Sequence, residues 1–190
     1  MVLIPINKCL CLNTFNRWQY ERGNFSRARP LADDALNLCS LEEDRDLVSK
    51  IHDVLGCIAN GTNDAVLSMR HTKKFLFIRQ EIAKDQGEND VLLAYAHNQM
   101  GCSFMMADRY EEAQKYFLEA LRIWQNIPQF LKASSPRFSK ALSSMEYANL
   151  GLAYWLQGDF SLASSILEEG HSVREEQFGP MDTESMRYPT

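Results

Sequence analysis

Apolar residues recur along most of the chain at spacings of three and four positions, the period of an amphipathic helix. The alternation of apolar and polar residues that marks a half-buried strand is nowhere sustained. Polar turns divide the helical pattern into eight segments. We predict helices over residues 8–22, 26–40, 42–60, 64–85, 90–107, 110–126, 137–157 and 160–178. The sequence therefore predicts an all-α protein.

Two stretches of the chain are copies of one motif of small and large residues. In each copy a glycine is followed 12 positions later by an alanine, and four positions after that by a large apolar residue. The copies contain Gly101, Ala113 and Phe117, and Gly151, Ala163 and Leu167. Small residues let two antiparallel helices approach closely where they cross, and the large residue fills the space beside the crossing. We therefore interpret each copy as a pair of packed helices.

Weaker copies of the motif precede these two. Gly23, Phe25 and Ala28 repeat its turn and second helix, and Gly56 with Ser68 marks a poorer copy. The equivalent small residue of the four copies is Ala28, Ser68, Ala113 and Ala163 in turn. Successive copies are therefore 40, 45 and 50 positions apart.

One helical pair cannot bury its apolar faces alone, so neighbouring pairs stack into a solenoid. We predict a right-handed α-solenoid of about four antiparallel helical pairs, all in one domain spanning residues 1–180. The predicted units cover residues 8–40, 42–85, 90–127 and 137–178, and a C-terminal tail follows at 181–190.

The composition is that of a soluble globular protein. Apolar residues make up 45% of the 190 residues and charged residues 24%, and the net charge is −5. An acidic chain with dispersed lysine and arginine argues against a nucleic-acid partner. Neither a secretory signal nor a run of about eighteen apolar residues occurs, so we predict no membrane partner. Five cysteines form an odd set, which indicates reduced thiols in the cytosol or the nucleus, and we predict a cytoplasmic location.

Two clusters were candidates for chemistry. His52, Asp53 and Cys57 place an imidazole and a thiol on one helix, but the side chains point in different directions and no oxyanion site accompanies them. Cys9 and Cys11 lack the second pair of ligands that structural zinc requires. No His-Glu-x-x-His, Gly-x-Ser-x-Gly or dinucleotide-binding glycine pattern occurs. We predict a protein that is not an enzyme and that holds no metal or cofactor.

These repeats resemble the tetratricopeptide repeat, most strongly in the third and fourth units. Residues 97–101 and 120–123 are similar to the longer repeats of the kinesin light chain. Residues 147–158 and 174–185 are similar to repeats of fungal proteins in which such arrays often follow an NB-ARC or NACHT nucleotide-binding module. No Gly-x-x-x-x-Gly-Lys phosphate loop occurs, so the resemblance covers the repeat part alone. It implies a helical scaffold that binds a protein or peptide.

In the arrays that this chain resembles, the first helix of each pair lines a concave groove. Counted from the crossing glycines, we predict a peptide-binding groove formed by Tyr95, Asn98, Met105, Asn149, Leu152 and Trp155. Amides can hold a peptide backbone while apolar residues accept its side chains. The basic residues with which some tetratricopeptide proteins hold a terminal carboxylate are missing from the third and fourth units. The alternative for each groove residue is that it only packs against neighbouring helices.

The resemblance also leaves two other functions open. The chain could be the sensor part of a fungal nucleotide-binding receptor, or an accessory protein of a fungal biosynthetic gene cluster. Helical arrays normally carry polar capping helices, and both ends of this chain look clipped. We therefore expect a fragment of a longer array, or self-association through array ends. The sequence does not identify the partner.

Overall fold

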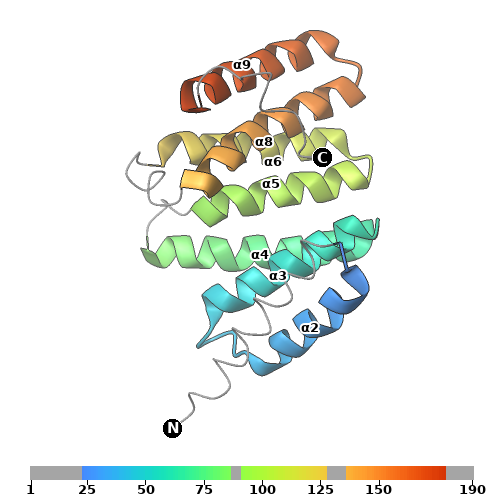
Figure 1. The fold of residues 1–190 in the computed structure, drawn as a ribbon, viewed down its shortest axis with the longest axis vertical. Coiled ribbons are helices and arrows are strands. Elements are labelled where there is room, and N and C mark those ends of the chain that lie inside the picture. Colours follow the sequence, from blue (N-terminus) through green and yellow to red (C-terminus); the bar gives the residue numbers. More distant parts are fainter. Residues whose placement is uncertain (1–22, 87–90, 128–135, 179–190) are drawn as a thin grey trace, which may run out of the picture.

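The structure is a computed structural model, and it describes residues 23–86, 91–127 and 136–178 (Figure 1). These residues form seven α-helices and no strand, which confirms the predicted all-α fold. The helices are α2 (Phe25–Leu38), α3 (Arg45–Gly61), α4 (Ala65–Gln86), α5 (Val91–Met106), α6 (Tyr110–Asn126), α8 (Pro136–Leu156) and α9 (Phe160–Phe178). The predicted helix at 8–22 and the predicted tail at 181–190 lie outside the described residues.

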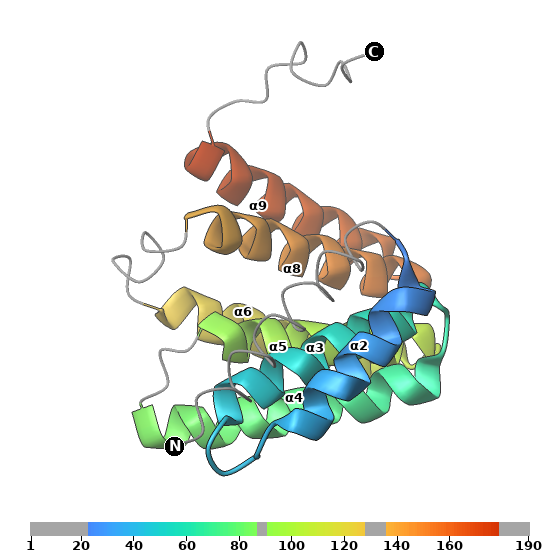
Figure 2. The ribbon, with the colours of Figure 1, turned by 60° about the horizontal axis from the view of Figure 1, so that its bottom comes forward.

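The helices pack as antiparallel pairs that stack along the long axis of the molecule (Figures 1 and 2). α3 packs with α4, α5 with α6, and α8 with α9, while α2 packs on α3. α3 also contacts α5, and α5 contacts α8. We call α3, α5 and α8 the inner row, and α4, α6 and α9 the outer row. This is the solenoid of helical pairs that the sequence predicts.

The boundary between α2 and α3 differs from the prediction. α2 ends at Leu38 and α3 begins at Arg45, whereas the sequence predicted helices to residue 40 and from residue 42. The Ser40 N–H donates to the Asp44 carboxylate at 3.1 Å, and the Asp44 N–H donates to the Ser40 carbonyl at 2.8 Å. Aspartate side chains often bond nearby backbone groups in this way instead of continuing a helix. The acidic residues Glu42, Glu43 and Asp44 therefore precede α3 and belong to the connection between the two helices.

The small residues lie at the helix crossings, as the motif predicts. A Cβ atom added at Gly101 would overlap the ring of Phe117. One added at Gly151 would lie 2.7 Å from Cγ of Leu167. Both alanines of the motif are buried. Glycine therefore lets α5 approach α6, and α8 approach α9, more closely than any side chain would allow.

The second unit departs from the motif because it carries buried hydroxyl groups at its crossing. Ser68 and Thr72 of α4 stand where the third unit has Ala113 and Phe117. The hydroxyl of Ser103, on α5, lies 2.7 Å from that of Ser68 and 2.9 Å from that of Thr72. These groups satisfy one another away from water. The weak sequence match of this unit reflects a polar contact between α4 and α5.

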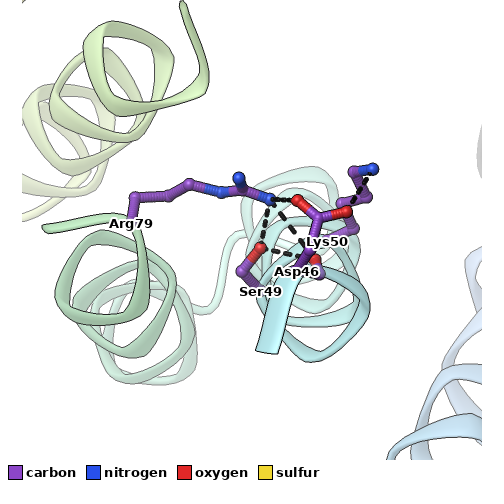
Figure 3. A network of polar contacts seen from close by, with 4 residues as sticks. All are labelled: Asp46, Ser49, Lys50 and Arg79. Atoms are coloured by element: carbon purple, nitrogen blue, oxygen red, sulfur yellow. Dashed lines mark hydrogen bonds and ion pairs between the residues drawn. The ribbon is translucent and has the colours of Figure 1, made fainter. Parts of the chain in front are cut away.

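A buried arginine ties α4 to the start of α3 (Figure 3). Nη2 of Arg79 lies 2.6 Å from Oδ1 of Asp46 and also donates to the Ser49 hydroxyl. The ammonium of Lys50 lies 2.6 Å from Oδ2 of Asp46. The repeat pattern did not predict this network, which joins residues 33 positions apart.

Candidate functional site

The six predicted groove residues lie on two adjacent helices of the inner row. α5 carries Tyr95, Asn98 and Met105, and α8 carries Asn149, Leu152 and Trp155. α5 and α8 contact each other, so the two sets lie on neighbouring elements. The six side chains differ in exposure. Tyr95 and Met105 are half-buried and pack against the hydrophobic core.

α8 presents an exposed apolar stripe. Met145, Leu152, Trp155 and Leu156 are all exposed and recur at helical spacings. Trp155 is 55% exposed, and its ring packs edge-on against that of Phe160 with the centroids 6.3 Å apart. Large apolar side chains gathered on one exposed face are typical of a binding surface. Leu152 and Trp155 are therefore the predicted groove residues most accessible to a partner.

Asn98 is a bridge between helices rather than an exposed contact. Its side chain is 0% exposed, and its Oδ1 accepts a hydrogen bond of 3.0 Å from Nδ2 of Asn149. The same Nδ2 lies 3.6 Å from Sγ of Cys102. Nδ2 of Asn98 makes no hydrogen bond within the described part of the chain. Asn98 thus orients the half-exposed amide of Asn149.

A second set of polar contacts joins α3 to α5. Nε2 of Gln99 lies 2.5 Å from the Tyr95 hydroxyl, 3.0 Å from Sγ of Cys57 and 3.3 Å from Oδ1 of Asp53. The sequence analysis missed Gln99. Gln99 lies 50 positions before Asn149, so the two residues are equivalent in the third and fourth repeats. Because Asn149 was predicted to line the groove, the repeat could also have indicated Gln99. Both amides join neighbouring helices of the inner row.

The cysteines differ from the prediction at one position. Cys57 and Cys102 are free thiols, but Cys39 is disulfide-bonded. The prediction of reduced thiols is therefore wrong for Cys39. Burial raises the pKa of the Cys102 thiol to about 11, so this thiol stays neutral at neutral pH. Cys9 and Cys11 lie outside the described residues.

His52 and Cys57 contact different neighbours. Nδ1 of His52 lies 3.1 Å from Nδ1 of His71 on α4, whereas Cys57 contacts Asp53 and residues of α5. Burial, followed by the charges of His71 and Lys74, lowers the pKa of His52 to about 4. The neutral imidazole is thus bonded to a second imidazole and not to the thiol.

Among the residues that the structure describes, no three histidine, cysteine, aspartate or glutamate side chains are grouped so as to hold a metal ion. No helix among those residues has both the length and the apolar character needed to cross a bilayer.

Comparison with known proteins bears on the fold and on the fourth unit. Residues 147–180 match the family model of the tetratricopeptide repeat. The chain is also similar to the crystal structure of BtubC (BKLC) from P. vanneervenii, with a TM-score of 0.51 and 18% identity over 94% of this chain and 84% of that chain. No curated protein matches it. Residues 147–180, most of the fourth unit, are therefore similar to a tetratricopeptide repeat, and the described chain has the fold of a tetratricopeptide-like helical solenoid.

Proposed function

We propose that this protein is a non-enzymatic scaffold that binds a peptide segment of another protein along its inner row. The observation that carries the proposal is the exposed apolar stripe of α8, with Leu152 and Trp155, beside the half-exposed amide of Asn149. The tetratricopeptide repeat at residues 147–180 supports a role in protein interaction in general.

The chemistry of this surface suits a peptide backbone with apolar side chains. An amide both donates and accepts hydrogen bonds, so Asn149 can pair with a peptide group. Asn98 accepts the hydrogen bond that orients this amide, which makes it a positioning residue. Leu152 and Trp155 offer apolar area, and burial of one large apolar side chain contributes about 1.5–3 kcal/mol.

We infer that the bound segment is internal rather than a chain terminus. A terminal carboxylate binds tightly where lysine or arginine pairs with it. Neither α5 nor residues 145–156 of α8 contain lysine or arginine. On α3, Lys50 lies 2.6 Å from the carboxylate of Asp46 and is thus already paired.

The combined substitution Trp155→Ala and Asn149→Ala tests the groove. Affinity purification with mass spectrometry should recover partners with the wild-type chain that the double variant loses. Leu118→Ala, which truncates an exposed leucine on the outer helix α6, is the matched control and should retain them. Overlapping peptides from a recovered partner should bind with the same dependence. Identical partner sets for the double variant and the control would refute the proposal, provided that both melt like the wild type.

A second candidate is weak self-association through the C-terminal end of the stack. Leu167 is 47% exposed, whereas Phe117, at the equivalent position of the preceding pair, is 0% exposed. A second copy that covered Leu167 would remove apolar area from water. Light scattering should show a concentration-dependent dimer that Leu167→Glu abolishes. A wild-type chain that stays monomeric at every concentration would contradict this candidate.

The receptor and biosynthetic alternatives remain proposals that depend on the resemblance of residues 147–158 and 174–185 to fungal repeats. The genes that flank this one would distinguish them. Receptor genes favour the sensor role, and a set of biosynthetic enzymes favours the accessory role. The cytoplasmic location is likewise a proposal, which microscopy of the tagged chain would test.

A further inference from the structure

An apolar cavity lies between the end of α2 and the middle of α4. Its volume is about 490 Å³, and Leu36, Leu41, Val48, Phe77 and Ile78 form its apolar wall. A second cavity of about 440 Å³ shares Leu41, Phe77 and Ile78 and continues toward the start of α3. Because they share these residues, the two cavities adjoin along α4, and we call them together the outer groove. Cavities of this size are typical of small-molecule sites.

The outer groove leaves two large apolar side chains in water. Leu41 is 53% exposed and Phe77 is 60% exposed. Single exposed apolar residues are ordinary, but these two share one groove with the buried side chains of Val48 and Ile78. An apolar chain in this groove would contact both exposed and buried walls and would remove apolar area from water.

One end of the outer groove carries positive charge. Lys73 and Lys74 line it, and neither forms an ion pair with any residue that the structure describes. Three cations and one carboxylate act on the neighbouring imidazole of His71, namely Lys74, Arg70, Arg29 and Asp33. This end of the groove therefore favours an anion.

The other end of the outer groove has a different charge balance. Arg45 is paired with Asp85, and Glu81 lies 2.5 Å from Lys84. Glu42 also lines this end and makes no ion pair among the described residues. A second anionic group on a ligand would meet Glu42 here without a free cation to offset it.

We propose that the outer groove binds a free medium-chain fatty acid, with its carboxylate at Lys73 and Lys74 and its alkyl chain along Leu41, Phe77 and Ile78. The eight positions from Lys73 to Glu81 rise about 12 Å along α4, so the groove suits an elongated ligand. Lysine ammonium groups bind a carboxylate as compact point charges. The single carboxylate of a fatty acid matches the positively charged end of the groove, and its uncharged alkyl chain matches the apolar wall and the end that lacks a free cation.

Calorimetric titration with dodecanoate below its micelle concentration tests the proposal on the full chain. We expect saturable binding with one site per chain. Dodecyltrimethylammonium, which has the same alkyl chain and a cationic head, should bind at least tenfold more weakly. Dodecanedioate should also bind at least tenfold more weakly, because its second carboxylate meets Glu42.

Substitutions locate the site. Phe77→Glu should abolish binding, and combined Lys73→Glu and Lys74→Glu should weaken it at least tenfold. Val66→Glu, at an exposed apolar position of α4 that does not line the groove, and Lys115→Glu on α6 are the matched controls and should bind as the wild type does. All these positions are exposed, and thermal unfolding checks that each variant folds.

Three results would overturn the proposal: no saturable binding of dodecanoate, equal binding of the cationic analogue, or equal affinities of Phe77→Glu and Val66→Glu. Sedimentation with phosphatidylserine vesicles that Phe77→Glu abolishes and Val66→Glu does not, in a chain that shows no saturable binding of dodecanoate, would assign the surface to membranes instead. The inner-row double variant Trp155→Ala and Asn149→Ala should bind dodecanoate normally, so failure of one proposal is distinct from failure of the other.

Discussion

Arg79 is a charge placed in the interior, and a few individual contacts stabilise it. Its guanidinium reaches the Asp46 carboxylate at 2.6 Å and lies over the ring of Phe75, 5.9 Å from the ring centroid. Burial raises the pKa of Asp46, but hydrogen bonds from Lys50 and Arg79 outweigh burial, and the pKa is lowered overall. Asp46 is therefore ionised at neutral pH, and its charge offsets that of the arginine.

Arg79 is buried and Asp46 is exposed, so we expect substitutions of these two residues to lower the free energy of unfolding by different amounts. Asp46→Asn removes the Asp46 carboxylate from the buried guanidinium, and we expect a loss of about 1–3 kcal/mol of unfolding free energy. Arg79→Met should cost less, because the Asp46 carboxylate is exposed and still contacts Lys50. Urea denaturation measures both. Lys50→Met, which removes an exposed pair, should change stability by less than about 0.5 kcal/mol. A larger loss for Arg79→Met than for Asp46→Asn would contradict this account.

His52 predicts a dependence of stability on pH. Its pKa is lowered to about 4 in the folded chain, first by burial and then by His71 and Lys74, whereas an unfolded histidine titrates near 6.5. Between these values the unfolded chain binds more protons, so the stability present above about pH 6.5 is lost as the pH falls toward about 4. The free energy of unfolding can change with pH by at most about 1.4 kcal/mol per pH unit for one such group.

The measurement is the urea midpoint at several pH values between 7.5 and 4.5. His52→Gln should flatten the decline, whereas His171→Gln, at an exposed position of α9, should leave it unchanged. The pKa of His71 is also lowered, chiefly by burial, so a smaller slope of the same sign should remain in His52→Gln. If the urea midpoint declined with pH equally in the wild type and in His52→Gln, His52 would not be the cause of the decline.

At the scale of elements, the repeated turn is as regular as the helix crossing. Four residues with positive φ lie in the turns, with values of 69°, 58°, 55° and 86° at Gly23, Asn63, Asp108 and Gly158. They step along the chain by 40, 45 and 50 positions, as the small residues of the motif do. Glycine, asparagine and aspartate tolerate this left-handed conformation better than other residues do. One turn conformation therefore serves every described pair.

The helix crossings predict a graded effect of adding one methyl group. Gly101→Ala should cost about 1–3 kcal/mol, because the ring of Phe117 that it would overlap is fully buried and has no room to move. Gly151→Ala should cost less, since Leu167 is half exposed and can move away. Thermal unfolding of the two variants compares them. Equal melting temperatures, or a larger loss at Gly151, would contradict the assigned packing.

At the scale of the whole molecule, α9 differs from α6 in a way that suits the end of the described stack. The 50-residue step makes three residues of α6 equivalent to three of α9. They are Phe117, Leu121 and Trp124 on α6, and Leu167, His171 and Arg174 on α9. The α6 residues are buried, whereas the α9 residues are exposed and two of them are polar. Polar residues at these positions keep α9 compatible with water.

Restoring the α6 pattern on α9 should strengthen self-association. In His171→Leu combined with Arg174→Trp, the end of the stack gains a continuous apolar face with Leu167. Light scattering should then show dimers or larger species at concentrations where the wild type is mainly monomeric. Glu175→Leu adds one apolar residue outside the equivalent set and serves as the control. A monomeric double variant would show that these positions do not control association.

The repeat pattern predicted most of the helices, and the groove residues that it suggested stay a prediction. Helix positions, the crossing glycines and the exposure of Leu152 and Trp155 follow from spacing, because contacts within one pair join residues at fixed offsets. The pattern was wrong at the α2–α3 boundary, where the carboxylate and the N–H of Asp44 both bond the backbone of Ser40. It also missed the bridging amide of Gln99, although Gln99 stands two positions before Gly101, as Asn149 stands two positions before Gly151.

Local features of the chain set the class of fold, the register of the helical pairs and the turn between their helices. These depend on residue size, polarity and backbone preference, which each residue carries with it. The tertiary structure alone decided that Asn98 is buried against Asn149, that Arg79 reaches Asp46, and that Leu41 and Phe77 share a groove. Such contacts join residues 33 or more positions apart, and they form only where stacked pairs bring two side chains within a few ångströms of each other.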